Sequence, residues 1–328
     1  MAQRSLIEVF CMQAVILAAG KGSRLHPITT NRSKAMLPIL GKPIVERVME
    51  HLAINGIDDF ILVVSPDDTQ ITRYFRRESQ LEADVRFVYQ PQRLGMADAL
   101  RCAAPLVDAD FILSACDNLT SPQHVANLLA DWRKPPCPNA VLTLLTIPPE
   151  QVPASGVVAM EGDTVVRIVE KPRLQDAPSH IASLPLYGLP YSLLGYLSEL
   201  QPSPRGEYEL QDAIQLLIQR QGRVRGVMVA NRLTLTSPAD LLHINRHFLM
   251  EGNDMPQIQP QRVGAGTQLT TPLHIDAGVQ IGAGCRIGPN VYIERNCRIG
   301  DGATIRDAIL LRESVVPPQA VIHDEVVS

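Results

Sequence analysis

Residues 14–25 read AVILAAGKGSRL, in which small and apolar residues run directly into a loop of two glycines, a lysine and an arginine. The apolar run predicts a buried strand, and a basic glycine loop after such a strand is typical of a phosphate site. Three kinds of site share that pattern: a dinucleotide fold, a P-loop and a nucleotidyl-transfer site. The surrounding sequence has to decide among them.

Composition places the 328-residue chain among ordinary globular proteins, with 45% hydrophobic and 20% charged residues. This length predicts about two domains. The net charge of -4 gives no broad basic surface, so we expect no nucleic-acid partner. Six scattered cysteines without a CxxC pair indicate the thiols of a reducing compartment.

No segment approaches the roughly 20 consecutive apolar residues of a membrane helix, and the N-terminal sequence lacks the pattern of a signal peptide. We therefore expect a cytoplasmic protein without a membrane partner. Strand-like sequence resumes directly after Met12. Residues 1–11 are therefore an expected N-terminal extension, and Met12 is a candidate natural start.

From residue 14 to residue 248, short apolar runs alternate with helical patterns. Strands are predicted at 14–18, 59–65, 85–90, 110–116 and 140–147, and helices at 43–57, 67–78, 96–106 and 121–132. This alternation predicts a mostly parallel, Rossmann-like α/β sheet with helices on both faces. Alternating segments at 155–172 and 179–190 predict antiparallel strands added to that sheet, and a further helix is expected at 209–222.

The hydrophobic period becomes six after a polar linker, predicted at residues 250–262. Aliphatic residues stand six apart at Ile275, Ile281, Ile287, Ile293, Ile299, Ile305 and Leu311, and smaller or β-branched residues recur in phase at Val279, Cys285, Val291, Cys297, Ala303 and Ile309. In such a hexapeptide repeat each unit forms one face of a triangular coil, and stacking buries the aliphatic column. We predict a short left-handed parallel β-helix at 263–328, with eight units from Ile275 to Ile322.

Two of the three phosphate sites fail on the residues around the glycine loop. A dinucleotide fingerprint needs a third glycine where Leu25 stands, and an acid at the end of the second strand, which arrives about twenty residues too late. The GxxxxGK[ST] pattern of a P-loop is absent. A plain turn with exposed charges is the alternative, but Lys21, Arg24 and Lys34 together favour bound phosphate.

The stretch LAAGKGSRLHPITTNRSKAMLPILGKPIVERVM resembles the signature G-x-G-[ST]-R-[LM], followed by a lysine and GKP, of the sugar-phosphate nucleotidyltransferase family. The resemblance extends through most of residues 14–248, and several members also carry a C-terminal β-helix. In this family a sugar 1-phosphate attacks the α-phosphorus of a nucleoside triphosphate and pyrophosphate leaves, with Mg²⁺ and protein cations neutralising charge. The resemblance therefore implies both substrates, a Mg²⁺ cofactor, and a catalytic domain at residues 12–249.

The same resemblance implies a nucleotide site. Arg24 would clamp the triphosphate and Lys34 would reach the reacting phosphates. The segment YQPQRLGMADAL resembles the base-reading stretch Q-x-x-x-L-G-T of the family, with Met96 in place of the threonine. The nucleotide-binding residues implied in this way are Ala19, Gly20, Gly22, Ser23, Gln90 and Gly95.

A metal site is implied at Asp117, because the family keeps an aspartate at the end of this strand, where such sheets bind ligands. The alternative role for Asp117 is a helix cap, although Ser121 and Pro122 already supply one. Two alignments compete for the second ligand. One places Thr234 there and loses the ligand, whereas ANRLTL resembles a motif whose asparagine binds Mg²⁺, which makes Asn231 the expected partner.

The sugar site is implied by SGVV and VEKP: Gly156 as a close backbone approach, Glu170 on the sugar hydroxyls and Lys171 on the sugar phosphate. An exposed ion pair at a strand end is the alternative for Glu170 and Lys171. The family element N-T-G-[IL]-Y is reduced here to SLPLY. Ser183 and Pro185 therefore replace the asparagine and glycine that shape the sugar pocket.

The expected function is a UTP- or dTTP-dependent transferase that acts on glucose 1-phosphate or N-acetylglucosamine 1-phosphate. A regulatory paralogue without activity is a second possibility, suggested by Met96, Ser183 and Pro185. A bifunctional enzyme with an acetyltransferase β-helix is a third, but His274 and His323 are expected at the surface rather than at a catalytic position. The β-helix is expected to be structural and to join copies of the chain into a homo-oligomer.

Overall fold

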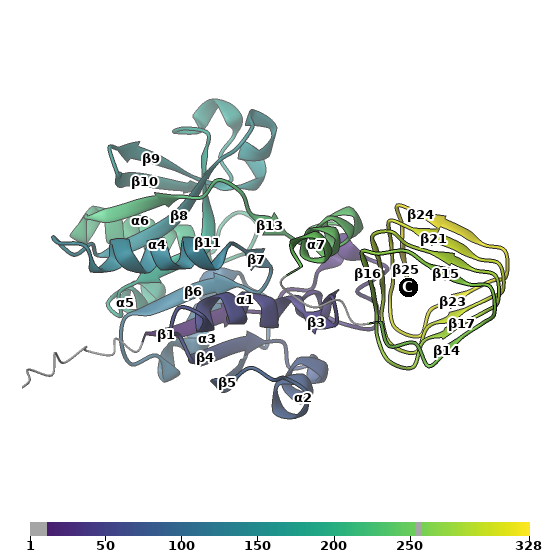
Figure 1. Ribbon diagram of the computed structural model, residues 1–328. Helices are drawn as coiled ribbons and strands as arrows, with labels where there is room; N and C mark the ends of the chain where they lie inside the picture. Colours follow the sequence, from purple (N-terminus) through teal and green to yellow (C-terminus); the bar gives the residue numbers. More distant parts are fainter. Residues whose placement is uncertain (1–11, 253–257) are drawn as a thin grey trace, which may run out of the picture. The chain divides into compact units, whose positions relative to one another are not determined.

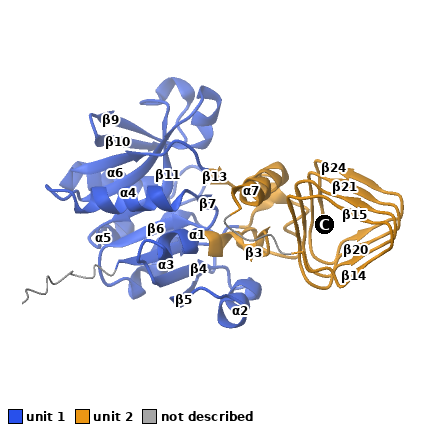
Figure 2. Cartoon of the chain, in the orientation of Figure 1, with its two compact units in different colours: residues 1–20, 48–232 blue, residues 21–47, 233–328 orange. Residues whose placement is uncertain are grey.

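The computed structural model describes residues 12–252 and 258–328 (Figure 1). It divides into two compact units (Figure 2). Unit 1 comprises the chain up to Gly20 together with Val48–Arg232, and unit 2 comprises Lys21–Arg47 and Leu233–Ser328. The predicted extension at 1–11 lies outside the described residues, as does the part of the predicted linker at 253–257.

Unit 1 is built on a nine-stranded sheet with the strand order β5-β4-β1-β6-β11-β8-β12-β10-β9. Its strands are β1 (Gln13–Leu17), β4 (Asp59–Val64), β5 (Asp84–Tyr89), β6 (Phe111–Ala115), β8 (Ala140–Thr146), β9 (Gly156–Glu161), β10 (Thr164–Glu170), β11 (Ile181–Leu189) and β12 (Val224–Met228). Neighbours among β5, β4, β1 and β6 run parallel, and β11 is antiparallel to both β6 and β8. The predicted α/β sheet with antiparallel strands is confirmed, but the sheet is not mostly parallel, because β11 lies between β6 and β8 and pairs antiparallel with both.

Successive residues of the central strands are buried, which indicates that helices cover both faces of the sheet. Ala14, Val15 and Ile16 of β1 are each fully buried, which a sheet with one solvated face could not provide. The helices are α1 (Ile44–Ala53), α2 (Thr69–Arg77), α3 (Met96–Ala103), α4 (Pro122–Arg133), α5 (Leu193–Tyr196) and α6 (Leu210–Gln221). As predicted, α6 ends at Gly222, whose positive φ of 61° lets its N–H reach the carbonyl of Ile218.

Unit 2 ends in three four-stranded parallel sheets, coloured green to yellow in Figure 1. The first sheet contains β14 (Arg262–Val263), β17 (Gln280–Ile281), β20 (Arg298–Ile299) and β23 (Val315–Val316), and the second contains β15 (Gln268–Leu269), β18 (Arg286–Ile287), β21 (Thr304–Arg306) and β24 (Val321–His323). The third contains β16 (Leu273–Ile275), β19 (Val291–Ile293), β22 (Ala308–Leu310) and β25 (Val326–Val327). Successive strands enter successive sheets, so the chain winds as a coil, here called the C-terminal coil. Its core contains Cys285 and Cys297 as free thiols.

The aliphatic column keeps the predicted spacing of six only as far as Ile305. Ile293 pairs with Leu310 rather than with Leu311, and Ala308 rather than Ile309 occupies the small position in the core. The turn at Asp307, which has a φ of 49°, is one residue shorter than the earlier turns. Leu310 and Leu311 are both leucines, so the pattern of side chains alone could not reveal the lost residue.

The outer face of the third sheet of the coil is covered, unlike the outer faces of the other two. Its outward residues His274, Tyr292 and Ile309 are each at most 5% exposed. The rest of unit 2 supplies the elements η1 (Ser23–Leu25), η2 (Lys34–Met36), β2 (Pro38–Ile39), β3 (Lys42–Pro43), β13 (Leu233–Thr234) and α7 (Pro238–Glu251). Helix α7 packs against β2 and β25, and its start is fixed by a reciprocal capping box between Ser237 and Asp240.

Within the described residues, no helix combines the length and the apolar character that a membrane crossing requires. The remaining short strand is β7 (Asn118–Leu119), which follows the turn after β6 in unit 1.

Candidate functional site

The predicted phosphate loop is a compact structure within unit 2. Gly22 has a φ of 65°, and a Cβ atom there would lie 2.9 Å from the Cβ of Lys34, so only glycine fits. The hydroxyl of Thr29 donates to the carbonyl of Gly22 at 3.2 Å and closes the loop. Lys34 therefore lies directly against the glycine loop, although twelve residues separate them in sequence. Ser23 and Arg24, in η1, are exposed to solvent.

Ala19 and Gly20 follow β1 in unit 1. A Cβ atom on Gly20 would meet nothing within 4 Å, so the backbone at this position is open to an approaching ligand. The Nε of Arg93 donates to the carbonyl of Ala19 at 2.8 Å, and one of its terminal nitrogens donates to Ser65 at 3.1 Å. Sequence reasoning missed Arg93, although a cation in the loop QPQRLG after a strand end was the available signal.

The predicted base-reading residues shape a turn in unit 1. The side-chain amide of Gln90, which is buried, donates to the carbonyl of Gly95 at 3.2 Å and to Asp98 at 2.9 Å. A Cβ atom on Gly95 would lie 2.5 Å from the carbonyl oxygen of Tyr208. Gly95 is therefore required by the close approach of another part of the chain, and base reading by these two residues stays a prediction.

Asp117 lies in the turn between β6 and β7 and is partly exposed. It does not cap α4, because the side chain of Ser121 accepts the N–H of His124 and fills that role. Next to Asp117, the side chain of Asn118 is buried, and neither its oxygen nor its nitrogen has a hydrogen-bond partner among the described residues. Sequence reasoning missed this unpaired amide.

Asn231, the expected second metal ligand, is exposed and follows β12, whereas Thr234 lies in β13 of unit 2. Strands β6, β8 and β12 run in one direction, so the chain leaves β6 and β12 at the same edge of the sheet. In the described part of the chain, no three His, Cys, Asp or Glu side chains are grouped to hold a metal. A single carboxylate with amide oxygens suits Mg²⁺, which takes only one or two protein carboxylates and fills its shell with water and substrate phosphate.

The predicted sugar residues form a charged cluster at the end of β10. One carboxylate oxygen of Glu170 lies 3.2 Å from the ammonium of Lys171 and 3.7 Å from Arg205. Arg205 also binds Glu209 at 2.7 Å. Lys171 itself has a φ of 44°, an uncommon conformation for a residue with a side chain. Strained backbone of this kind concentrates at functional sites.

Two oxygen atoms of this cluster have no donor. Oε2 of Glu170 and Oε1 of Gln211 are buried, and neither accepts a hydrogen bond from any described residue. Burial raises the pKa of Glu170, and the nearby Glu209 raises it further, while Lys171 and Arg205 act to lower it. The cluster therefore presents two acceptors ready for hydroxyl donors.

Gly156 lies beside these acceptors, but its small size serves the protein itself. A Cβ atom there would lie 2.8 Å from Oε2 of Glu170 and 3.1 Å from Cγ of Gln211. Gly156 pairs with Glu170 across β9 and β10. Glycine is thus needed to admit the two side chains, whether or not a sugar also approaches.

Ser183 is hydrogen bonded to Tyr187 over 2.7 Å, and both side chains are buried. Burial raises the pKa of Tyr187 well above its usual range, so this phenol stays neutral. Pro185 lies where the pairing of β11 with β8 is interrupted, a place that tolerates a residue without an N–H. The departure from the family element therefore coincides with a bulge.

Comparison with known proteins identifies the family to which the chain belongs. The nucleotidyl transferase family model matches residues 13–232. The chain belongs to this family. This confirms the resemblance to the sugar-phosphate nucleotidyltransferases. A second model, the GMPPB C-terminal domain, matches residues 269–328.

Several curated relatives and solved structures are similar to this nucleotidyltransferase family member. The bifunctional protein GlmU of Methanococcus maripaludis is 34% identical over 242 residues, which are 73% of this chain and 54% of that protein. The UTP–glucose-1-phosphate uridylyltransferase AglF of Haloferax volcanii is 30% identical over 213 residues, 65% of this chain and 85% of that protein. The chain thus spans about half the length of the GlmU proteins it matches. A UDP-glucose pyrophosphorylase complexed with UDP-glucose shares the fold, with a TM-score of 0.66 and 23% identity over 74% of this chain and 99% of that one.

The histidines of this family member differ from expectation at one position. His323 is exposed, as predicted, and pairs with Asp307 and Asp324. His274 is buried rather than at the surface, and its Nε2 is hydrogen bonded to Asp276 at 2.9 Å. The reason is that His274 points outward from the one sheet of the coil whose outer face is covered.

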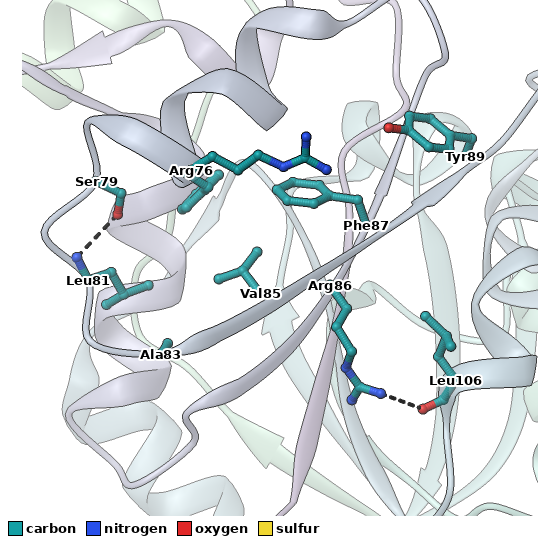
Figure 3. Close-up of a pocket in the computed structure, with 10 residues that line it drawn as sticks. Arg76, Ser79, Leu81, Ala83, Val85, Arg86, Phe87, Tyr89 and Leu106 are labelled. Carbon is teal, nitrogen blue, oxygen red and sulfur yellow. Dashed lines mark hydrogen bonds between the residues drawn. The ribbon is translucent and has the colours of Figure 1, made fainter.

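A separate cavity of about 520 Å³ lies along edge strand β5 (Figure 3). Figure 3 shows Arg76 of α2 beside Phe87, and the guanidinium carbon lies 5.8 Å from the centre of that ring. None of the predicted catalytic, nucleotide, sugar or metal residues lines this cavity.

Proposed function

We propose that the chain transfers a uridylyl group from UTP to a sugar 1-phosphate, with glucose 1-phosphate as the first candidate. Thymidylyl transfer from dTTP and use of N-acetylglucosamine 1-phosphate are the alternatives. Family membership supports the reaction class, and the name of the Haloferax volcanii relative supports UTP and glucose 1-phosphate. The observation that carries the proposal is the pair of buried acceptors at Glu170 and Gln211 that have no partner among the described residues, because a hexose offers several hydroxyl donors.

The proposed reaction is a displacement at phosphorus. A phosphate oxygen of the sugar 1-phosphate forms a bond to the α-phosphorus of the triphosphate, and the bond from that phosphorus to the bridging oxygen of pyrophosphate breaks. Negative charge gathers on both the attacking and the leaving groups. The work of the protein is therefore to hold two polyanions together and to neutralise them.

Arg24 and Lys34 are the residues we assign to the triphosphate. The planar guanidinium of Arg24 can orient a phosphate through two parallel hydrogen bonds, while the ammonium of Lys34 acts as a mobile point charge. The packing of Lys34 against Gly22 fixes the base of its side chain beside the loop. Ala19, Gly20 and Ser23 complete the proposed nucleotide site with backbone and hydroxyl groups.

Asp117 and Asn231 are the residues that would hold Mg²⁺, which supplies charge neutralisation to the triphosphate when bound. Asp117 carries no capping role in the fold, and hard oxygen donors are what this ion prefers. The unpaired amide of Asn118 adds a further oxygen close by in the chain. These three side chains give the site one negative charge of its own and leave the rest to the substrate.

At the sugar end, Glu170 accepts hydroxyl hydrogens most strongly while it is ionised. Lys171 now neutralises the other oxygen of Glu170, and we propose that it turns to the phosphate of the sugar when that substrate binds. Arg205 can take over the pairing with Glu170, because it already lies 3.7 Å away. The C-terminal coil, proposed to be a left-handed β-helix that joins copies of the chain, contributes no group to this chemistry.

A substrate panel tests the proposal directly. Five nucleoside triphosphates are combined with glucose, N-acetylglucosamine and mannose 1-phosphates, and pyrophosphate release is measured with Mg²⁺ and with EDTA. We expect one pair containing UTP or dTTP to turn over only with Mg²⁺. Arg24→Gln should raise the KM for the nucleotide by at least tenfold, whereas Arg77→Gln, an exposed arginine on α2, should leave it unchanged.

Two other outcomes of the substrate panel would contradict the proposal. If no pair turns over while nucleotide sugars still bind, as measured by calorimetry, the chain is a regulatory paralogue and the proposal is wrong. Turnover by a purine nucleotide with another sugar would keep the reaction class but overturn the substrate assignment.

A further inference from the structure

A buried ion pair connects residues 31–41, the segment that contains Lys34, to the C-terminal coil. The two terminal nitrogens of Arg32 donate to the two carboxylate oxygens of Glu294 at 2.9 and 3.0 Å. The side chains of Arg32 and Glu294 are only 6% and 9% exposed. Two parallel charge-assisted bonds in a buried setting fix orientation as well as distance. Arg32 lies two residues before Lys34.

A third hydrogen bond completes Glu294 and a fourth extends the contact. The backbone N–H of Arg312 donates to Glu294 at 2.7 Å, and its guanidinium donates to the carbonyl of Asn31 at 3.2 Å. Burial lowers the pKa of Arg312, and the neighbouring charge of Arg32 lowers it further. One end of the segment at residues 31–41 is therefore held by two groups of the coil, the carboxylate of Glu294 and the guanidinium of Arg312.

The other end of the segment is held by a second set of coil residues. The hydroxyl of Tyr292 donates to Asp276 at 2.9 Å and accepts the backbone N–H of Gly41. Asp276 is also bonded to His274. Gly41 has a φ of 83°, and a Cβ atom there would lie 3.3 Å from the carboxylate of Asp276, so the turn fits closely over these side chains.

Helix α7 adds a third support from within unit 2. The side-chain oxygen of Asn245 accepts the N–H of Leu40 at 3.0 Å, and its amide donates to the carbonyl of Pro38 at 3.2 Å. Asn245 is buried. Residues 31–41 are thus anchored at both ends, and Lys34 lies between the anchors.

We infer that the covered face of the C-terminal coil is a positioning device for the phosphate loop. In this arrangement Glu294 is a positioning residue that holds Lys34 through Arg32, while Tyr292 and Asp276 hold the far end of the segment at Gly41. The catalytic consequence for Lys34 rests on the proposed nucleotidyl transfer. The coil then supports the phosphate loop in addition to its proposed role in joining copies of the chain.

The test compares Glu294→Gln with Arg286→Gln, which removes an exposed charge from the outer face of another sheet of the same coil. Hydrogen exchange is followed for peptides that cover residues 29–42 and, as internal references, β4 and β6. We expect exchange in 29–42 to become at least tenfold faster in Glu294→Gln and to stay unchanged in Arg286→Gln and in the reference strands.

Kinetics separate positioning from general damage. Glu294→Gln should raise the KM for the nucleotide at least tenfold and lower kcat, while the KM for the sugar 1-phosphate stays within twofold. Arg32→Lys, which keeps the charge but not the paired geometry, should fall between the wild type and Arg32→Ala. Should Glu294→Gln fail to fold, Tyr292→Phe removes a single hydroxyl and gives the same exchange readout at Gly41.

Unchanged exchange in 29–42 for both Glu294→Gln and Tyr292→Phe would overturn the inference. Faster exchange with equal effects on both substrates would also overturn it, because the change would then not be specific to the loop. If the loop loosens as expected but the wild type transfers no nucleotide, the proposed function is wrong while the anchoring of the loop stands.

Discussion

Two buried polar clusters of this molecule differ in how completely their acceptor atoms are hydrogen bonded. Around Glu294 in the C-terminal coil, both carboxylate oxygens are bonded to Arg32 and one also accepts the N–H of Arg312. Around Glu170 at the end of β10, one carboxylate oxygen is paired, whereas the other, like the side-chain oxygen of Gln211, has no donor among the described residues. Leaving a buried acceptor open costs about 1–3 kcal/mol. We call the first cluster closed, because its carboxylate oxygens are all paired, as a structural anchor requires. We call the second open, because it keeps acceptors available, as a ligand site requires.

The largest expected effect concerns Asp117, in the turn that follows β6. Asp117→Ala should lower turnover about a thousandfold, as expected for the loss of one charged group that acts on the reacting phosphates. Helix α4 should keep its stability, because Ser121 rather than Asp117 is its cap. Pyrophosphate release and thermal unfolding measure the two quantities.

Ser121→Ala is the matched control for that variant. It removes the cap that the structure does show, so it should cost about 1 kcal/mol of stability and leave turnover unchanged. Retained activity in Asp117→Ala would contradict the metal assignment. Asp117 would then have a structural role in this turn.

A smaller effect on activity and an opposite effect on stability are expected for Glu170→Gln. Loss of a charged acceptor should raise the KM for the sugar 1-phosphate on the order of 10- to 100-fold. The raised pKa of Glu170 means that the folded protein holds this proton more tightly than the unfolded chain does. Its contribution to stability is therefore present at low pH and lost as the pH rises through the raised pKa.

The neutral glutamine avoids that loss. Glu170→Gln should have a higher Tm than the wild type at pH 8, and the difference should disappear as the pH falls below the pKa of Glu170. Scanning calorimetry from pH 4 to pH 8 measures this. A lower Tm at pH 8 would mean that the pairs with Lys171 and Arg205 outweigh burial, and that Glu170 belongs with the closed cluster.

The smallest effect is expected at Ser183, which the resemblance places at the sugar. Its hydroxyl is already bonded to Tyr187, so by the same comparison it is structural. Ser183→Ala should cost about 1–2 kcal/mol in urea unfolding, because the phenol of Tyr187 loses its partner, and should leave the KM for the sugar within twofold. Tyr187→Phe should cost a similar amount, and the two losses should not add. A tenfold higher KM at unchanged stability would instead return Ser183 to the sugar site.

The local sequence pattern predicted much of the fold. Apolar runs such as residues 14–18 and 59–65 predicted the parallel strands, because a strand buried on both faces must be hydrophobic throughout. The period of six predicted the coil for the same reason, since each unit places one residue in the column. The prediction went wrong at Leu311, where two adjacent leucines concealed a turn that is one residue short.

The glycines show where sequence reading of a site reaches its limit. Gly22 and Gly95 are predicted to bind the nucleotide, and Gly156 is predicted to approach the sugar through its backbone. In the structure, a Cβ atom at these positions would collide with Lys34, Tyr208 and Glu170 respectively. The sequence identified positions that tolerate no side chain, but it could not identify the neighbour that excludes one.

The sequence by itself therefore determined the architecture, the family and the residue types at the proposed site, because hydrophobic period and signature motifs are local properties of the chain. Only the tertiary structure decided which polar groups are closed and which are open. Arg32 and Glu294 are 262 residues apart, and no local pattern pairs them. Hydrogen-bond satisfaction is a property of neighbours in space, so the anchor of the phosphate loop and the open acceptors at Glu170 and Gln211 became visible only in the folded chain.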